Sequence, residues 1–437
     1  MRGAARSWLA AARVYGDRRV IAILFLGFSS GMPLLLTLST LSIWLTEEEI
    51  SKTTIGLFAM IGLPYTLKFI WAPLIDRLHL PLLTRWLGRR RGWAILTQLG
   101  LMVGIVGLGG SDPAGNAFAV AVWALVVTFA SASQDVVIDA YRVEILEERQ
   151  YGAGAAMIVA GYRLGMLASG AGALYLAEAV SWFWVYAAMA GLMGVGIVTV
   201  LVNPEPDLPA ADDAASPLDD PMAWLNDAVI GPFAEFLRRG GWLPILLFVL
   251  FYKFGDSLAG VMANPFYVEI GFSKSEIASV SKIFGLIATL GGGFLGGLLV
   301  VRAGIMQSLL WCGLLQMVSN LMFAIQALVG HDIAMLSLTI GVENIAGGMG
   351  TAAFVAYLSA LCNVAYTATQ YALLSSFMAL ARTVLSAPGG ALADATDWVT
   401  FFLVTTVAAL PGLLLWWWLM RRGIVPEMAR AAAGAEG

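Results

Sequence analysis

Apolar residues form twelve long runs along this chain, and short polar segments separate them. A helix rises about 1.5 Å per residue, so roughly 20 apolar residues cross a hydrocarbon core about 30 Å thick. The pattern therefore predicts an all-α integral membrane protein with about twelve transmembrane helices. The predicted crossings are residues 20–45, 53–75, 92–110, 115–141, 154–178, 181–201, 242–267, 275–300, 304–328, 333–362, 367–391 and 397–420.

The distribution of lysine and arginine agrees with this topology, because basic loops stay on the cytoplasmic side of a membrane. With a cytoplasmic N-terminus, 18 of the 25 basic residues fall in inward-facing segments, two in outward loops and five within predicted helices. We therefore predict a multi-pass protein of the bacterial inner membrane with both termini in the cytoplasm. The first crossing is too long for a signal-peptide core and no small-residue cleavage site follows it, so we expect it to remain uncleaved.

Composition supports a membrane protein and excludes some chemistry. Hydrophobic residues make up 59% of the 437 positions, charged residues only 12%, and the mean hydropathy is +0.81, whereas soluble domains carry about 25% charged residues. Cys312 and Cys362 lie in predicted crossings and the chain has only two histidines, so neither a disulfide nor a metal site is expected. Nothing indicates nucleic-acid binding. We expect membrane lipids as surroundings and a monomeric protein.

The longest polar interruption divides the chain into two halves. Its first part is rich in Pro, Ala and Asp, which favours a flexible segment; apolar residues at helical spacing follow, from Leu225 to Leu237, and predict a short amphipathic helix that Pro232 breaks or restarts. A covalent connection with no role in transport is the simpler interpretation of this segment. The predicted organisation is a cytoplasmic segment at 1–19, a six-helix bundle at 20–202, the linker at 203–241, a second six-helix bundle at 242–421 and a cytoplasmic tail at 422–437.

Short matches at a constant offset indicate that the two halves are related. Residues 51–55 (SKTTI) recur as 273–277 (SKSEI), and the pair at 150–151 (QY) recurs at 370–371, each pair being followed by an arginine, Arg163 or Arg382. The offsets of 222 and 220 residues are nearly equal. A duplicated six-helix unit is therefore expected, and transporters are commonly built from such repeats.

Ionisable residues inside the predicted helices are the main indication of function, because such groups are costly in a bilayer and usually mark a pathway. Spacings of four and three residues place Asp135, Asp139 and Arg142 on one face of the fourth helix, with Asp135 about 10 Å deeper than Arg142, which we expect to reach the cytoplasmic interface. A carboxyl group shielded from water can hold and release a proton in each cycle. The proton-coupling candidates are Asp135, Asp139, Glu343 and Asp256.

A second group of polar and basic residues in the helices could meet a solute. Arg163, Lys253 and Glu343 lie about halfway across, and Asp256 follows Lys253 by about one turn. An intrahelical ion pair between Lys253 and Asp256 is the alternative interpretation. The substrate-binding candidates are Lys68, Gln134, Arg163, Lys253, Asn264, Lys282, Asn320 and Asn344.

Glycine-rich stretches and a tryptophan run have structural interpretations. Small residues at 27–33, 291–297, 347–350 and 388–390 could act as hinges, but close helix packing explains each more simply. The three tryptophans at 416–418 are interpreted as an aromatic belt at the membrane interface.

Six motifs distributed over both halves resemble those of the AmpG muropeptide permeases, a family of the major facilitator superfamily. They are GFSSGMPL at 27–34, KFIWAPLIDR at 68–77, GRRRGW at 88–93, SASQD at 131–135, GYRLGM at 161–166 and ENIAGGMGT at 343–351. The resemblance implies the major facilitator fold and proton-driven import of N-acetylglucosaminyl-1,6-anhydro-N-acetylmuramic acid, with or without its peptide, from periplasm to cytoplasm for peptidoglycan recycling. It implies no cofactor, since the proton gradient supplies the energy.

The same resemblance implies a conformational latch in the loop between the second and third helices. In the superfamily this loop is thought to hold the two bundles together through charge and helix-end contacts, and here its residues would be Asp76, Arg77, Arg89, Arg90 and Arg91.

Three other functions stay open from the residues alone. A related importer of another bulky solute, such as a siderophore, would use similar helices. A membrane enzyme would need a nucleophile, a metal or an acid–base constellation at a membrane face, and none stands out. A channel fits the duplicated architecture less well than a transporter does.

Overall fold

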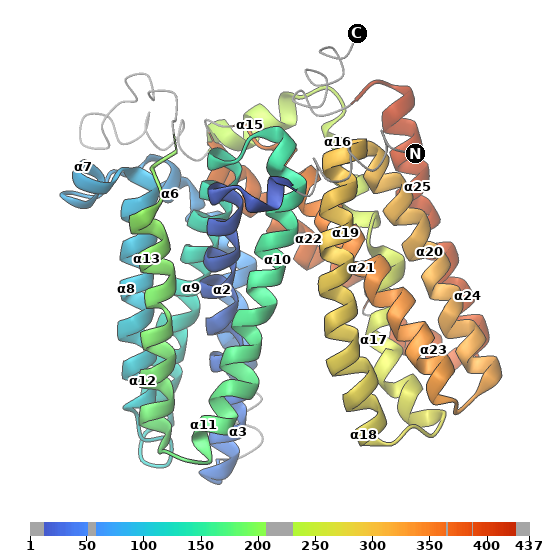
Figure 1. The fold of residues 1–437 in the computed structure, drawn as a ribbon, viewed down its shortest axis with the longest axis horizontal. Coiled ribbons are helices and arrows are strands. Elements are labelled where there is room, and N and C mark those ends of the chain that lie inside the picture. The colour runs from blue at the N-terminus through green and yellow to red at the C-terminus, as the bar shows by residue number, and fades with distance from the viewer. Residues whose placement is uncertain (1–12, 51–57, 207–229, 364–365, 387, 425–437) are drawn as a thin grey trace.

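The structure, a computed structural model, describes residues 13–50, 58–206, 230–363, 366–386 and 388–424. The described part of the chain consists of helices joined by short loops and contains no strand. Its helices run roughly parallel in two groups, one on either side of the molecule in Figure 1. The first described residues of the chain, the helix α15 and the end of α25 lie at the same end of the molecule, here called the terminal end.

Two lists give the bounds of the helices. The first half contains η1 (Val14–Gly16), α2 (Arg18–Thr37), α3 (Ser39–Glu47), η2 (Phe58–Gly62), α5 (Leu63–Leu67), η3 (Lys68–Ile70), α6 (Ala72–Arg77), α7 (Leu83–Leu87), α8 (Arg89–Gly109), α9 (Ala117–Ile145), η4 (Glu148–Gln150), α10 (Tyr151–Leu167), η5 (Ala168–Gly172), α11 (Ala173–Ala177), α12 (Trp182–Leu192) and α13 (Gly194–Val202). The second half follows α15 (Gly231–Arg238) and contains α16 (Trp242–Phe251), α17 (Phe254–Glu269), α18 (Lys274–Ile277), η7 (Ala278–Phe284), α19 (Gly285–Ala303), α20 (Ile305–Val329), α21 (Ile333–Leu361), α22 (Thr367–Ser386), α23 (Gly389–Ala395), α24 (Trp398–Ala408) and α25 (Leu410–Arg421).

Ten helical segments of the described chain are long and apolar enough to cross a membrane. The remaining two predicted crossings are interrupted: the second consists of η2, α5, η3 and α6, and the eleventh consists of α22 and α23. These two crossings pack against each other across the middle of the molecule, α22 against α5, η3 and α6. Irregular backbone is tolerated at membrane depth where it is buried against protein, and this contact provides such a surface. The prediction of about twelve crossings in two six-helix bundles is confirmed.

Glycines allow the closest helix contact in the first half, between α2 and α10. A Cβ atom added at Gly27 would lie 2.5 Å from the carbonyl oxygen of Ile158, and one at Gly161 would lie 1.9 Å from that of Leu24. Both distances are far inside van der Waals contact, so a larger residue would force the helices apart. The close-packing interpretation of the small-residue stretch at 27–33 therefore holds, as expected for membrane helices.

The buried apolar residues show where the two halves meet. One cluster includes side chains from both halves, among them Tyr141 and Tyr151 of the first and Phe354 and Tyr371 of the second. Two further clusters each belong to a single half and lie toward the opposite end of the molecule. The halves therefore share a core at the terminal end and have separate cores at the other.

The linker helix α15 belongs structurally to the second half. Pro232 is at the first turn of α15, a position where proline is favourable, while Leu225 and Val229 of the predicted helix lie outside the described residues. Arg239 and Glu235 form an ion pair of 2.7 Å, and Gln370 near the start of α22 donates to both Glu235 and the carbonyl of Pro232. These contacts fasten α15 to the beginning of α22.

The three tryptophans at 416–418 were predicted to form an aromatic belt at the membrane interface, but they do not all face outward. Trp416 is buried and its indole donates to the carbonyl of Met306, 2.8 Å away. Trp417 is 46% exposed on the outer surface, and Trp418 is partly exposed. Three consecutive residues span about 200° around a helix, so one of them must face inward.

Candidate functional site

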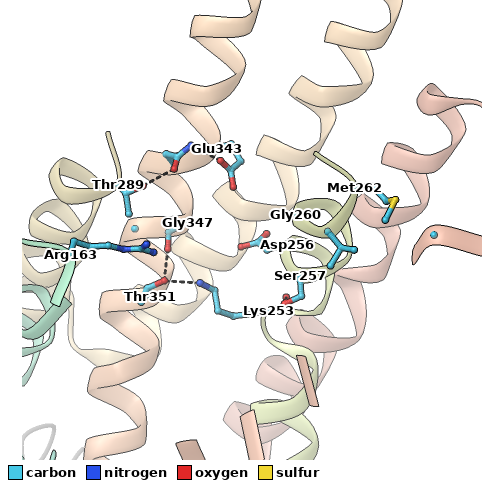
Figure 2. Close-up of a pocket in the computed structure, with 14 residues that line it drawn as sticks. Arg163, Lys253, Asp256, Ser257, Gly260, Met262, Thr289, Glu343, Gly347 and Thr351 are labelled. Carbon is cyan, nitrogen blue, oxygen red and sulfur yellow. Dashed lines mark hydrogen bonds between the residues drawn. The ribbon is translucent and has the colours of Figure 1, made fainter. Parts of the chain in front are cut away.

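A polar cavity of about 910 Å³ lies between the two halves. Arg163 reaches it from α10 of the first half, whereas Lys253, Asp256 and Glu343 reach it from the second half (Figure 2). All four come from the middle third of their membrane segments. Sequence reasoning had placed Arg163, Lys253 and Glu343 halfway across, and the fold brings these three charged groups and Asp256 into one space.

The helix that carries Lys253 is interrupted at the cavity. α16 ends at Phe251 and α17 begins at Phe254, so Lys253 precedes the first turn of α17 and Asp256 lies within it. Interrupted helices near the bilayer midplane are a common way to build a transport site, because the free backbone groups and helix ends face the ligand. The break therefore places two opposite charges at the wall of the cavity.

Both residues have hydrogen-bond partners on other helices. Lys253 donates through Nζ to the hydroxyl of Thr351 on α21, at 2.7 Å, and Asp256 accepts a bond from the amide of Gln316 on α20. These bonds hold the ammonium and the carboxylate on neighbouring parts of the cavity wall. Gln316 and Thr351 were not among the predicted site residues. They lie far along the chain from Asp256 and Lys253, and only helix packing brings them together, so the sequence could not predict these contacts.

Glu343 lines the main cavity, and its neighbour Asn344 lines both this cavity and a smaller one of about 390 Å³. The Asn344 amide donates to the Glu343 carboxylate at 2.7 Å, and Asn344 Oδ1 accepts from the hydroxyl of Thr289 at 2.6 Å. Arg163, Thr289 and Asn344 line both cavities, so the two spaces are adjacent. Ala171 and Ser281, which line the smaller one, belong to the π-helical segments η5 and η7. Such segments are frequent at functional sites.

A second group of charges lies within the first half. The hydroxyl of Ser30 on α2 donates to the Asp135 carboxylate. Asp139, one turn away on α9, is 3.9 Å from Lys68 Nζ and 3.5 Å from an Arg142 nitrogen. The predicted face of α9 therefore carries two acidic groups followed by one basic group, and Lys68 of the interrupted second crossing adds a second basic group beside Asp139.

We expected Arg142 to reach the cytoplasmic interface. Its side chain is instead fully buried between the halves. It donates through Nη1 to the hydroxyl of Ser359 on α21, at 2.8 Å, and its guanidinium lies 5.0 Å from the ring centre of Tyr371 on α22. Arg142 thus connects the acidic group of Asp139 to two helices of the other half. Its partner Tyr371 belongs to the repeated QY pair at 370–371, and this repeat was the feature of the sequence that could have indicated a role for Tyr371.

Asp76 occupies the clearest contact between the halves. This buried carboxylate accepts bonds from the backbone N–H groups of Ala368 (3.1 Å) and Thr369 (2.7 Å), and from the Thr369 hydroxyl at 2.6 Å. These are free N–H groups of the first turn of α22, where a negative charge is favourable. On its other side Asp76 accepts from Arg90 at 2.7 Å, and Arg90 also bonds to Glu144.

The other three predicted latch residues differ in their positions. Arg77 lies 5.2 Å from the ring centre of Tyr366 and so also faces the second half. Arg91 does not, since it donates to the carbonyls of Val200 and Leu201 at the end of α13 in its own half. Consecutive residues of a helix point about 100° apart, so Arg90 and Arg91 of α8 contact different neighbours. Arg89 is partly buried at the start of α8.

The remaining predicted substrate residues lie away from the main cavity wall described above or cannot be placed. Gln134 is buried and donates to the carbonyl of Ser29 inside the first half, and Asn320 is buried inside the second. Asn264 is exposed on α17. The side chain of Lys282 lies outside the described part of the structure.

Comparisons with known proteins agree with this architecture. Residues 23–342 match the family model described as the Major Facilitator Superfamily. Two solved structures share the fold: a human organic anion transporter (17% identity, TM-score 0.63, covering 93% of this chain and 99% of that one) and the Escherichia coli fucose:proton symporter FucP (10% identity, TM-score 0.66, covering 92% and 97%). The chain is therefore a membrane transporter of the major facilitator superfamily and not an enzyme.

More similar sequences define the family within that superfamily. The anhydromuropeptide permease of Escherichia coli K12 is 40% identical over 404 residues, which cover 92% of this chain and 79% of the permease. A Rickettsia felis protein named AmpG 4 is 35% identical over 412 residues, covering 94% of this chain and 98% of that protein. The chain belongs to the AmpG family of muropeptide permeases.

Proposed function

We propose that this protein imports anhydromuropeptides from the periplasm to the cytoplasm, coupled to protons, by alternating access across the bacterial inner membrane. The observation that carries the proposal is the cavity in which Arg163 of one half faces Lys253, Asp256 and Glu343 of the other. Its volume of about 910 Å³ is near the upper end of ligand sites, which span about 300–1,000 Å³. The name of the E. coli relative supports the solute.

The chemistry of such a solute suits the cavity. The peptide of a muropeptide carries carboxylates, which Arg163 and Lys253 can bind, and its hydroxyl and amide groups can meet Thr289, Asn344 and Thr351. The two basic side chains come from different halves. A carboxylate held between Arg163 and Lys253 would therefore favour closure of the halves around the solute, which is the differential binding that a ligand-driven change requires.

The packing of the halves supports alternating access with the terminal end closed in this structure. Asp76, Arg142 and the shared apolar core join the halves at that end. With the termini in the cytoplasm, this is the state that accepts solute from the periplasm. Opening the cytoplasmic side must then break the Asp76 and Arg142 contacts, and a proton on the carboxyl groups of α9 would weaken the attraction that holds Arg142 near Asp139.

The direct test is uptake of labelled anhydromuropeptide into membrane vesicles of defined orientation. Right-side-out vesicles should accumulate the solute when a proton gradient is imposed and lose the excess when an uncoupler removes the gradient. Equal uptake in vesicles that lack the protein, or accumulation that ignores the gradient, would contradict import coupled to protons.

Lys253→Ala should weaken solute binding by roughly 30-fold or more, because truncating one partner of a desolvated charge pair costs about 2–5 kcal/mol. Binding of anhydromuropeptide to the purified variant, measured by calorimetry, checks this. Arg85→Gln provides the matched control, since it removes an exposed positive charge at the terminal end, on α7, and should bind normally. Unchanged affinity together with a lower melting temperature would instead assign Lys253 a structural role.

A further inference from the structure

A groove on the outer surface of the second half is separate from the transport cavity. It has a volume of about 380 Å³ and lies between the beginning of α16 and the end of α25. Its walls are the apolar side chains of Leu243, Leu247, Leu414, Trp417 and Trp418. Leu414 is 63% exposed and Leu243 is 50% exposed, so no described part of the chain covers the groove. In a membrane protein such a surface contacts acyl chains.

Positive charges border one end of the groove. The Arg421 guanidinium lies 4.0 Å from the ring centre of Trp417, and that of Arg422 lies 5.5 Å from that of Trp418. Both arginines are exposed, and both indoles line the groove. Stacking on an indole holds an arginine by about 0.5–1 kcal/mol at an exposed site. The charges are therefore held at the end of the groove rather than free to spread over the surface.

The linker helix adds to this positive region. A Cβ atom added at Gly241, which has φ +88°, would lie 2.7 Å from a side-chain atom of Ile424, so the turn between α15 and α16 packs against the end of α25. Arg238, three residues before this turn, is exposed. The groove lies beside this basic edge, between the neighbouring helices α16 and α25.

We propose that this groove is a binding site for one anionic phospholipid, with an acyl chain between α16 and α25 and the phosphate beside Arg421 and Arg422. An apolar groove with two positioned arginines at its end differs from the lipid contact that any outer helix surface makes. A neutral lipid would fill the apolar groove equally well, but only an anionic headgroup gains from two arginines, each of which contributes about a factor of five in affinity near a membrane surface. Basic edges next to apolar grooves between helices are suited to such lipids. The inference does not depend on which solute the protein carries.

The test uses the full-length protein in nanodiscs of phosphatidylglycerol or phosphatidylcholine, with native mass spectrometry to count retained lipids and thermal unfolding as a second measurement. Wild type should retain one phosphatidylglycerol preferentially and unfold at a higher temperature in that lipid. Arg421→Gln with Arg422→Gln should weaken its retention by roughly 10- to 30-fold. Excess inorganic phosphate should not reproduce the stabilisation, because it cannot occupy the apolar groove.

Two further variants make the result specific. Arg85→Gln removes one exposed arginine at the same end of the molecule and should leave retention unchanged. Leu414→Trp fills the groove without altering charge and should also displace the lipid. The proposal is overturned if the double variant keeps its preference for phosphatidylglycerol. It is also overturned if the double variant loses this preference while Leu414→Trp keeps it, because that pattern indicates diffuse electrostatic attraction to the surface and no lipid bound in the groove.

Discussion

Replacing Asp135 by Asn is expected to abolish accumulation driven by the proton gradient while preserving exchange of solute across the membrane. Asparagine has the same shape and still accepts the hydrogen bond from Ser30, but its amide cannot bind and release a proton. The variant should therefore fold and bind solute, yet be unable to couple its cycle to protons. Uptake into vesicles with an imposed gradient should fall to the level seen without a gradient, and exchange of labelled for unlabelled solute should continue.

Two controls define the role of Asp135. Asp112→Asn changes an exposed carboxylate in the loop before α9 and should accumulate solute as wild type does. Glu343→Gln tests the other leading candidate, which lies in the cavity wall of the second half. Wild-type accumulation by Asp135→Asn would return this residue to a structural role and shift the coupling to Glu343 or to the remaining carboxyl groups, Asp139 and Asp256.

Replacing Asp76 by Asn should open the terminal end of the molecule and reduce transport severely. The carboxylate accepts three bonds from the start of α22 and one from Arg90, and hydrogen bonds to a charged group contribute about 1.5–3 kcal/mol against about 1 for neutral ones. Cys362 is buried in the shared core beside this contact, so it reports opening. Maleimide labelling of Cys362, in a Cys312→Ser background, should become roughly 10- to 100-fold faster in the variant.

This measurement separates opening from unfolding. Arg91→Gln is the matched control, because Arg91 is adjacent to Arg90 but bonds to α13 within its own half, so its loss should leave the labelling rate of Cys362 close to that of wild type. A melting temperature near the wild-type value must accompany the faster labelling. Unchanged protection of Cys362 in Asp76→Asn would show that the latch is not needed to hold the terminal end closed.

The sequence patterns placed charged residues along the helices but could not predict their partners in the other half. Asp139 and Arg142 share a helix face, and the spacing of three residues was enough to place them together. The hydrogen bond from Arg142 to Ser359 joins residues 217 positions apart, and that from Thr369 to Asp76 joins residues 293 positions apart. Contacts over such separations depend on how the halves dock. Periodicity along one helix contains no information about that docking.

Local irregularities were the other feature that the pattern did not predict. The break between α16 and α17 at Lys253, and the π-helical segments η5 and η7, occur inside runs that were each predicted as one continuous crossing. No proline lies at the α16–α17 break, and Lys253 and Asp256 beside it were interpreted as site residues, not as the sign of an interruption. Such irregular backbone is tolerated in a membrane helix where it faces protein or a cavity, and only helix packing decides where that occurs.

What the sequence determined by itself is the architecture: an apolar chain with about twelve crossings, basic residues in alternate loops and two related halves. Bilayer thickness and the cost of unpaired backbone groups impose these features on each segment separately, so they can be inferred segment by segment. Only the tertiary structure decided that Arg163 faces Lys253, Asp256 and Glu343 across one cavity, that Arg142 is buried between the halves, and that Trp416 points inward. Each of these depends on which face of one helix meets which face of another, and that choice is made by packing the whole molecule.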